Sequence, residues 1–260
     1  MKITTLIENT AFAPWFTAEH GLSLFVEAAG HRFLFDAGQS GAFADNAGRL
    51  HIDLRSAEFA VLSHGHYDHG GGMTRFLECN RTAKIYVNQN AFGGHYNGAG
   101  RYIGLSDELR SSSRLILTGD EHTIAPGLTL HTCNDRPRAV PIESSGLTER
   151  VGDFLLPEEF RHEQSLLIEE KGRRILLSGC AHKGVLNLLH WFKPDVFVGG
   201  FHFKQLSPDD PRLRIWGEAM AKYDTVFYTG HCTGAEQYAV LKEILGDRLN
   251  AISTGGVFEI

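Results

Sequence analysis

The chain has 260 residues, of which 42% are hydrophobic and 22% are charged, and its formal net charge at pH 7 is -6. That length can bury a substantial core in one or two domains. No apolar stretch approaches the roughly 20 residues that a membrane-spanning helix needs, and the net negative charge gives no electrostatic reason to bind a polyanion. We therefore expect a protein that acts on a small molecule, with neither nucleic acid nor membrane as partner.

The cysteines and the N-terminus indicate a reducing compartment. The cysteines, at positions 79, 133, 180 and 232, form no CxxC pair, and a chain of this size needs no disulfides for stability. Residues 1–8 alternate like a strand and lack the basic segment and apolar run of a signal peptide. We expect a cytoplasmic protein with reduced thiols.

The first part of the chain alternates β-rich runs with glycines. A helix is predicted over residues 40–50 from the spacing of Phe43, Ala47 and Leu50. The predicted strands span residues 2–8, 22–28, 32–36 and 58–62. The last of these strands runs directly into a histidine-rich segment.

The remainder is predicted to alternate strands and helices around two irregular stretches, 92–113 and 134–161. The expected strands span 84–87, 165–169, 174–178, 196–198 and 225–228, and the expected helices 70–78, 183–192, 211–223 and 235–245. No repeat or linker interrupts this pattern, so we expect residues 1–260 to form a single α/β domain.

Three imidazoles and one carboxylate lie between positions 64 and 69, flanked by glycines. His64 and His66 are two residues apart, so an extended backbone points both rings the same way and lets them share one metal ion. Asp68 and His69 follow the turn and could reach a second metal; alternatively, Asp68 could act as a general base on a single metal's water. The spacing leaves both arrangements open.

The strand, the HxHxDH pattern and the glycine-rich helix entry resemble the signature of the metallo-β-lactamase superfamily. Within it, the segments 63–72, 179–184, 199–202 and 229–234 resemble the branch of 7,8-dihydropterin-6-methyl-4-(β-D-ribofuranosyl)aminobenzene-5'-phosphate synthases. The resemblance implies an α/β fold, an αββα sandwich of two mixed β-sheets flanked by helices.

The same resemblance implies further ligands at later strand ends. His162 matches the third histidine, His231 matches the final histidine, and Asp36 matches an aspartate that supports the histidine loop from the second shell. Cys180 falls where the family usually has a bridging aspartate. A thiolate favours zinc and can bridge two metals or hold one, so this departure leaves the metal count open, and a buried unligated thiol is the alternative.

His182 and His202 also follow strands, and either could replace a named ligand. We expect them to line the site, as a general acid for the leaving group or as a hydrogen-bond donor to a substrate phosphate, with a core histidine as the alternative. An anionic substrate would need cations near the metals. Four are available in the sequence: Lys183, Arg136, Arg138 and Arg101.

The expected function is that of a metal-dependent hydrolase with one or two divalent transition-metal ions, zinc being favoured over manganese or iron. A metal lowers the pKa of bound water from 15.7 toward about 7 and so supplies hydroxide at neutral pH. We expect hydrolysis of a small ester, preferably a phosphodiester or cyclic phosphate.

The alternatives are a transferase of the pterin-ribosyl synthase type and a non-catalytic metal-binding or regulatory module on the same fold. A di-iron redox centre is disfavoured, because the branch that carries one has glutamate at the position of His66. A homo-oligomer is left open.

Overall fold

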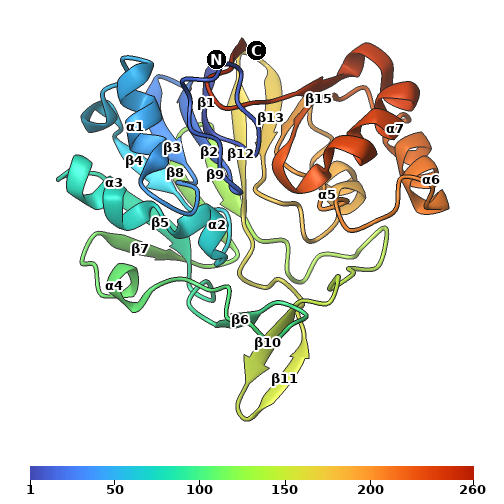
Figure 1. Cartoon of the computed structure of the whole chain (residues 1–260), viewed down its shortest axis with the longest axis horizontal. Coiled ribbons are helices and arrows are strands. Elements are labelled where there is room, and N and C mark those ends of the chain that lie inside the picture. Colours follow the sequence, from blue (N-terminus) through green and yellow to red (C-terminus); the bar gives the residue numbers. More distant parts are fainter.

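The strands form two large β-sheets that pack face to face, and helices cover the outer face of each sheet (Figure 1). The computed structural model describes residues 1–260. Its αββα arrangement confirms the predicted fold class. None of its helices is both long and apolar enough to cross a membrane.

The first sheet contains the N-terminal strands and one strand from the C-terminus. Its order is β17 (Val257–Glu259), β1 (Lys2–Ile7), β2 (Ser23–Ala28), β3 (His31–Phe35), β4 (Phe59–Val61), β5 (Lys84–Asn88) and β7 (Leu115–Thr118). The strands from β17 to β3 are antiparallel, whereas β3, β4, β5 and β7 are parallel.

The second sheet is formed by the C-terminal half of the chain. Its order is β16 (Leu249–Ala251), β15 (Val226–Thr229), β14 (Val196–Val198), β13 (Arg173–Leu177), β12 (Ser165–Glu170), β9 (Leu128–His131) and β8 (Glu121–Ala125). Strands β13 to β16 are parallel, and the other pairs are antiparallel.

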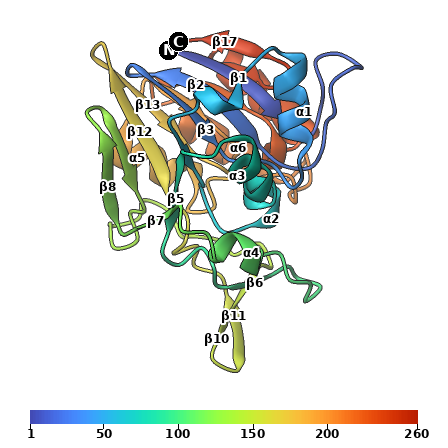
Figure 2. The same ribbon diagram turned by 90° about the vertical axis from the view of Figure 1, so that its left-hand side faces the viewer.

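A small third sheet projects from the sandwich in both views (Figures 1 and 2). Its strands are β11 (Phe154–Pro157), β10 (Thr148–Val151) and β6 (Gly94–Tyr96). The α-helices are α1 (Ala42–Arg49), α2 (Tyr67–Gly70), α3 (Met73–Cys79), α4 (Asp107–Arg110), α5 (Val185–Phe192), α6 (Pro211–Met220) and α7 (Ala235–Leu245). Short 3-10 turns lie at Leu54–Ser56, His231–Thr233 and Gly246–Arg248.

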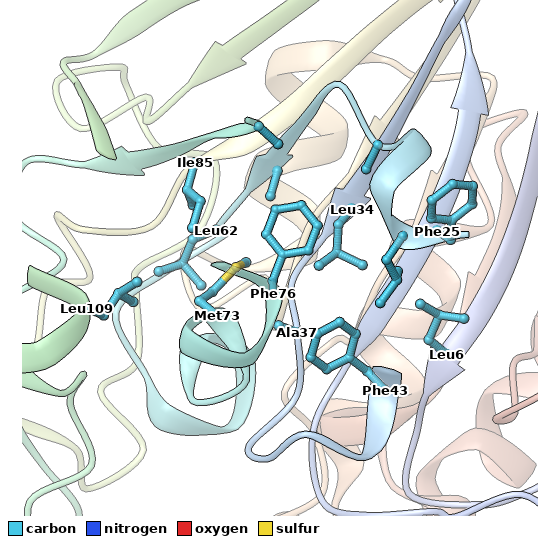
Figure 3. Packing of buried hydrophobic residues seen from close by; sticks show 14 of the residues in the cluster. Leu6, Phe25, Leu34, Ala37, Phe43, Leu62, Met73, Phe76, Ile85 and Leu109 are labelled. Carbon is cyan, nitrogen blue, oxygen red and sulfur yellow. The ribbon is translucent and has the colours of Figure 1, made fainter. Parts of the chain in front are cut away.

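The strands are apolar on both faces because each sheet is covered twice. In β3, Phe33 and Phe35 point into the layer between the sheets, while Leu34 packs under α1 and α3. Figure 3 shows that outer layer, where Leu34 lies close to Phe43 and Phe76. Strands covered on both faces are expected to be continuous hydrophobic runs, without alternation of apolar and polar residues.

The two stretches predicted to be irregular contain regular elements. Residues 92–113 include β6 and α4, and residues 134–161 include the β10–β11 hairpin. All four residues of β11 are exposed, so this strand has no buried face to mark it in the sequence. The sequence pattern also does not predict strands β7, β8 and β9.

Candidate metal centre

A first group of imidazoles lies where β4 and β13 end. The ring centroids of His64, His66 and His182 are 4.7 to 5.0 Å apart, and one nitrogen from each ring lies within 4.8 Å of the others. All of these side chains are buried. Nε2 of His64 and both ring nitrogens of His182 have no hydrogen-bond partner, which is costly for buried polar atoms unless a ligand binds there.

Side chains behind this group fix its orientation. Ser63 Oγ lies 2.8 Å from Nδ1 of His64 and donates to Asp36 Oδ2 over 2.7 Å. The His182 ring stacks on Phe160, with centroids 4.3 Å apart and an interplanar angle of 8°. Ligand rings that are held in this way lose little conformational freedom when a metal binds.

A second group adjoins the first and combines residues from both sheets. His69 Nε2 lies 3.1 Å from Cys180 Sγ and 3.1 Å from His231 Nε2. Asp68 Oδ2 lies 3.3 Å from the same nitrogen of His231. The His64 and His69 rings are 4.1 Å apart, so the two groups are neighbours.

In His69 and His231, hydrogen bonds to Nδ1 leave Nε2 as the nitrogen that faces the other ligand candidates. Asp36 Oδ2 is 2.7 Å from Nδ1 of His69, and Asn9 Oδ1 is 3.0 Å from Nδ1 of His231. Both oxygens accept, so each ring carries its proton on Nδ1. Carboxylate or amide partners of this kind are typical of metal-ligating histidines.

The residues of both groups fit a divalent transition metal. Imidazole, thiolate and carboxylate are the usual zinc ligands, and at Zn–N distances of about 2.0–2.1 Å two tetrahedral ligands stand about 3.3 Å apart. The separations around His69 Nε2 are close to that value.

The ionisation states have clear physical causes. Burial lowers the pKa of His64 and of His182 well below its usual value, so both rings are neutral, as metal binding requires. Burial also lowers the pKa of His69, but Asp36 and Asp68 overcome that effect and raise it to about 9, so a metal bound at its Nε2 would displace a proton. Burial and the neighbouring Cys232 raise the pKa of the Cys180 thiol.

A cavity opens over the two groups. Asp68, Cys180 and His231 line it together with His202 and the exposed Lys204. Burial lowers the pKa of His202 to about 4, so at pH 7 its neutral ring offers one N–H donor. The cavity thus has possible metal ligands at its floor and hydrogen-bond donors on its wall, and a small substrate could bind between them.

His162 does not lie where the resemblance placed it. Its Nδ1 accepts a hydrogen bond from the backbone N–H of Gly65 over 2.8 Å, and its Nε2 lies 2.7 Å from Glu158 Oε1. Both nitrogens are engaged away from the cavity. His182 lies beside His64 and His66 instead, so the first ligand group contains His182 and not the expected His162.

The expected substrate cations also lie elsewhere. Lys183 is buried, and its Nζ donates to the backbone oxygen of Glu163 over 2.6 Å, so it fixes the chain beside His182. The three arginines are exposed, and none lines the cavity; they are Arg101, Arg136 and Arg138. Lys204 is the cation on the cavity wall.

The site also contains residues that the sequence motifs do not indicate. His20 Nε2 lies 3.3 Å from Asp68 Oδ2, and Cys232 belongs to a possible ligand group with Cys180 and His231. The position of Cys232 directly after His231 is an available signal. His20 lies in a loop far from any motif and carries no such signal.

The fold and the two histidine-rich groups define a metal-binding protein of the αββα class. The sequence profile of the metallo-beta-lactamase superfamily matches residues 16–231. The chain belongs to that superfamily, and the resemblance inferred from the histidine segment is confirmed.

Individual relatives cover nearly the whole chain. An uncharacterized protein of Methanocaldococcus jannaschii is 28% identical over 251 residues, covering 93% of this chain and 94% of that protein. The 7,8-dihydropterin-6-methyl-4-(beta-D-ribofuranosyl)-aminobenzene-5'-phosphate synthase of the same organism is 25% identical and covers 100% of this chain and 96% of its own length. The crystal structure of Tm1679, described as a metal-dependent hydrolase of the beta-lactamase superfamily, has a TM-score of 0.85 at 24% identity and covers 100% of this chain and 99% of its own.

Proposed function

We propose that the chain is a metal-dependent hydrolase of small esters, with a phosphodiester or cyclic phosphate as the favoured substrate. The observation that carries the proposal is the convergence of two neighbouring ligand groups at the floor of one cavity. Two divalent ions, preferably zinc, would be held by His64, His66 and His182 and by the group around His69. Bound there, such ions act as Lewis acids and supply a nucleophile from water at neutral pH.

The chain's own residues bind and orient the substrate. Lys204 places a positive charge at the cavity wall, which favours an anionic substrate. His202, whose ring centroid lies 4.3 Å from that of His182, offers its N–H to an oxygen of the substrate. His182, which we expected as an alternative proton donor, is assigned here to the metal.

A second cavity suggests what else the substrate carries. It shares His182, His202 and Gln205 with the first, and its wall is apolar. The apolar side chains that line it include Val185, Leu186, Phe201, Phe203, Leu206 and Trp216. We therefore propose a substrate with an aromatic or branched apolar group beside the hydrolysed bond.

The test is metal analysis of the purified protein, followed by a hydrolysis panel of aryl phosphodiesters, alkyl phosphodiesters, lactones and thioesters. We expect metal-dependent turnover of the aryl phosphodiesters above the alkyl ones. Trp216→Ala should raise KM for the aryl compounds and leave the alkyl compounds unchanged. A metal-loaded protein that hydrolyses none of these esters would overturn the proposal.

A synthase activity is the second candidate, because the relative with that name matches along the entire chain. It differs from hydrolysis in its products, since a transferase forms a new bond between two substrates. Incubation of the metal-loaded protein with a dihydropterin that carries a leaving group on its 6-methyl carbon and with a ribofuranosylaminobenzene phosphate would distinguish the two. A condensation product without ester hydrolysis would favour the synthase.

A further inference from the structure

A carboxylate that the sequence does not point to lies directly behind the first ligand group. Glu158 is 2% exposed and immediately follows β11 (Phe154–Pro157), in the small projecting sheet. His66, His95 and His162 surround it, and all three are buried. The small sheet therefore contacts the histidine loop through one acidic side chain.

One oxygen of this carboxylate is held by a neighbouring imidazole. The backbone N–H of Gly65 donates to Nδ1 of His162, so the proton of that ring is on Nε2 and points at Glu158 Oε1, 2.7 Å away. Nδ1 of His95 lies 2.6 Å from the same oxygen, but without the geometry of a hydrogen bond. Oε1 thus accepts from His162 alone, which orients the carboxylate.

The other oxygen of Glu158 faces His66, in the histidine loop of residues 63–69. Glu158 Oε2 lies 3.4 Å from Nε2 of His66, and neither buried atom has another hydrogen-bond partner. A buried polar atom that is left without a partner destabilises the folded state, so both atoms favour a hydrogen bond between them. A hydrogen bond between these two atoms would leave Nδ1 as the one nitrogen of His66 that is free to bind a ligand.

We propose that Glu158 is a positioning residue that accepts the Nε2–H of His66 and thereby presents Nδ1 of that ring to the metal. The inference rests on the metal-binding part of the proposed function. A neutral imidazole has one N–H, so an acceptor at Nε2 decides which nitrogen is free to bind a cation. Glu158 thus acts on the metal through His66.

The same four side chains lie close enough together to hold a metal ion, but one hydrogen bond argues against a site of their own. His162 already accepts the Gly65 N–H at Nδ1. A metal at its Nε2 would therefore require the ring to lose its only proton. The carboxylate accepts that proton without any cation, so the cluster serves the neighbouring metal group.

The first experiment compares Glu158→Gln with Glu159→Gln, which makes the same charge change at the next, exposed position. A glutamine amide cannot accept on both sides, because its NH2 must face either His66 or the pair of His95 and His162. We expect Glu158→Gln to weaken zinc binding about 10- to 100-fold in a chelator competition and to change the visible spectrum of the cobalt-loaded protein. Glu158→Asp, which keeps two acceptors, should recover part of that loss.

A second measurement needs no variant and so does not depend on whether Glu158→Gln folds. In the wild-type protein loaded with cadmium-113 and labelled with nitrogen-15, we expect cadmium coupling to Nδ1 of His66 and a proton on Nε2. Coupling to Nε2 instead, or equal zinc affinity of folded Glu158→Gln and Glu159→Gln proteins, would overturn the inference. A wild-type protein that binds no metal would instead overturn the proposed function.

Discussion

At the scale of single residues, the site depends on which nitrogen of each ring is free. Asp36 provides the clearest case, because its two oxygens accept from the Ser63 backbone N–H, the Ser63 hydroxyl and Nδ1 of His69, each over 2.7 Å. One buried carboxylate thereby orients both ligand groups. Its position directly after β3 makes it visible in the sequence.

Asp36→Asn should therefore weaken metal binding without removing a ligand. An asparagine amide cannot accept all three hydrogen bonds, so His69 loses its fixed tautomer and Ser63 its anchor. We expect about 10- to 100-fold lower zinc affinity by chelator competition. As a control, Asp53→Asn alters an exposed aspartate that pairs with Arg55 at the surface, and its zinc affinity should equal that of the wild type.

The roles of His182 and His202 can be separated by metal content. His182→Ala removes a ring from the first ligand group, so the purified protein should hold about one metal equivalent less than the wild type. His202→Ala should keep the wild-type metal content and lose turnover, because His202 lines the cavity and is not needed to hold the metal. The reverse pattern would contradict the assignment.

At the scale of elements, the histidine loop is shaped by close backbone contacts. A Cβ at Gly65 would lie 2.1 Å from the backbone oxygen of Ala91, which cannot move as a flexible side chain does. Gly48, by contrast, lies in α1, where an added methyl group would have nothing within 4 Å of it. The two glycines therefore have opposite tolerance for alanine.

Gly65→Ala should lower the free energy of unfolding by about 2–3 kcal/mol and reduce zinc binding, because the loop must shift and carry both neighbouring histidines with it. Gly48→Ala should raise the free energy of unfolding by about 0.5–1 kcal/mol through better helix propensity. Chemical denaturation of both variants measures the difference. Equal effects would mean that the close contact at Gly65 is relieved without cost.

Some parts of the site can be predicted from the sequence, and others cannot, depending on the secondary-structure element that carries them. Strand ends that carry ligands, such as the segment after β4, combine a hydrophobic run with an unusual polar motif and can be located from the sequence. Glu158 and His95 cannot be located in this way, because Glu158 follows an exposed hairpin and His95 lies in a short strand, and neither element has apolar alternation. The ring direction of His162 cannot be predicted either, because spacing gives only its position along the chain, whereas Gly65 and Glu158 set the direction of its ring.

At the scale of the whole molecule, the ligand groups join the two halves of the sandwich. His64 and His69 follow β4 in the first sheet, whereas Cys180, His182 and His231 follow β13 and β15 in the second. Metal ions bound here would cross-link the two sheets at the C-terminal ends of these strands. The chain termini meet at the other end of the sandwich, where the Ile260 N–H donates to the Met1 backbone oxygen over 3.0 Å.

Metal removal should therefore destabilise the whole sandwich. A ligand that binds only the folded state at 100 times its Kd adds about 2.7 kcal/mol, which in a chain of this size corresponds to roughly 5–10 °C in Tm. We expect zinc to raise the Tm of the chelator-treated protein by that amount. The His64→Ala, His69→Ala double variant should lose most of the shift, whereas His31→Ala, which alters a histidine paired with Glu58 at the surface, should keep it. A full zinc shift in the double variant would show that zinc stabilises the protein from some other place.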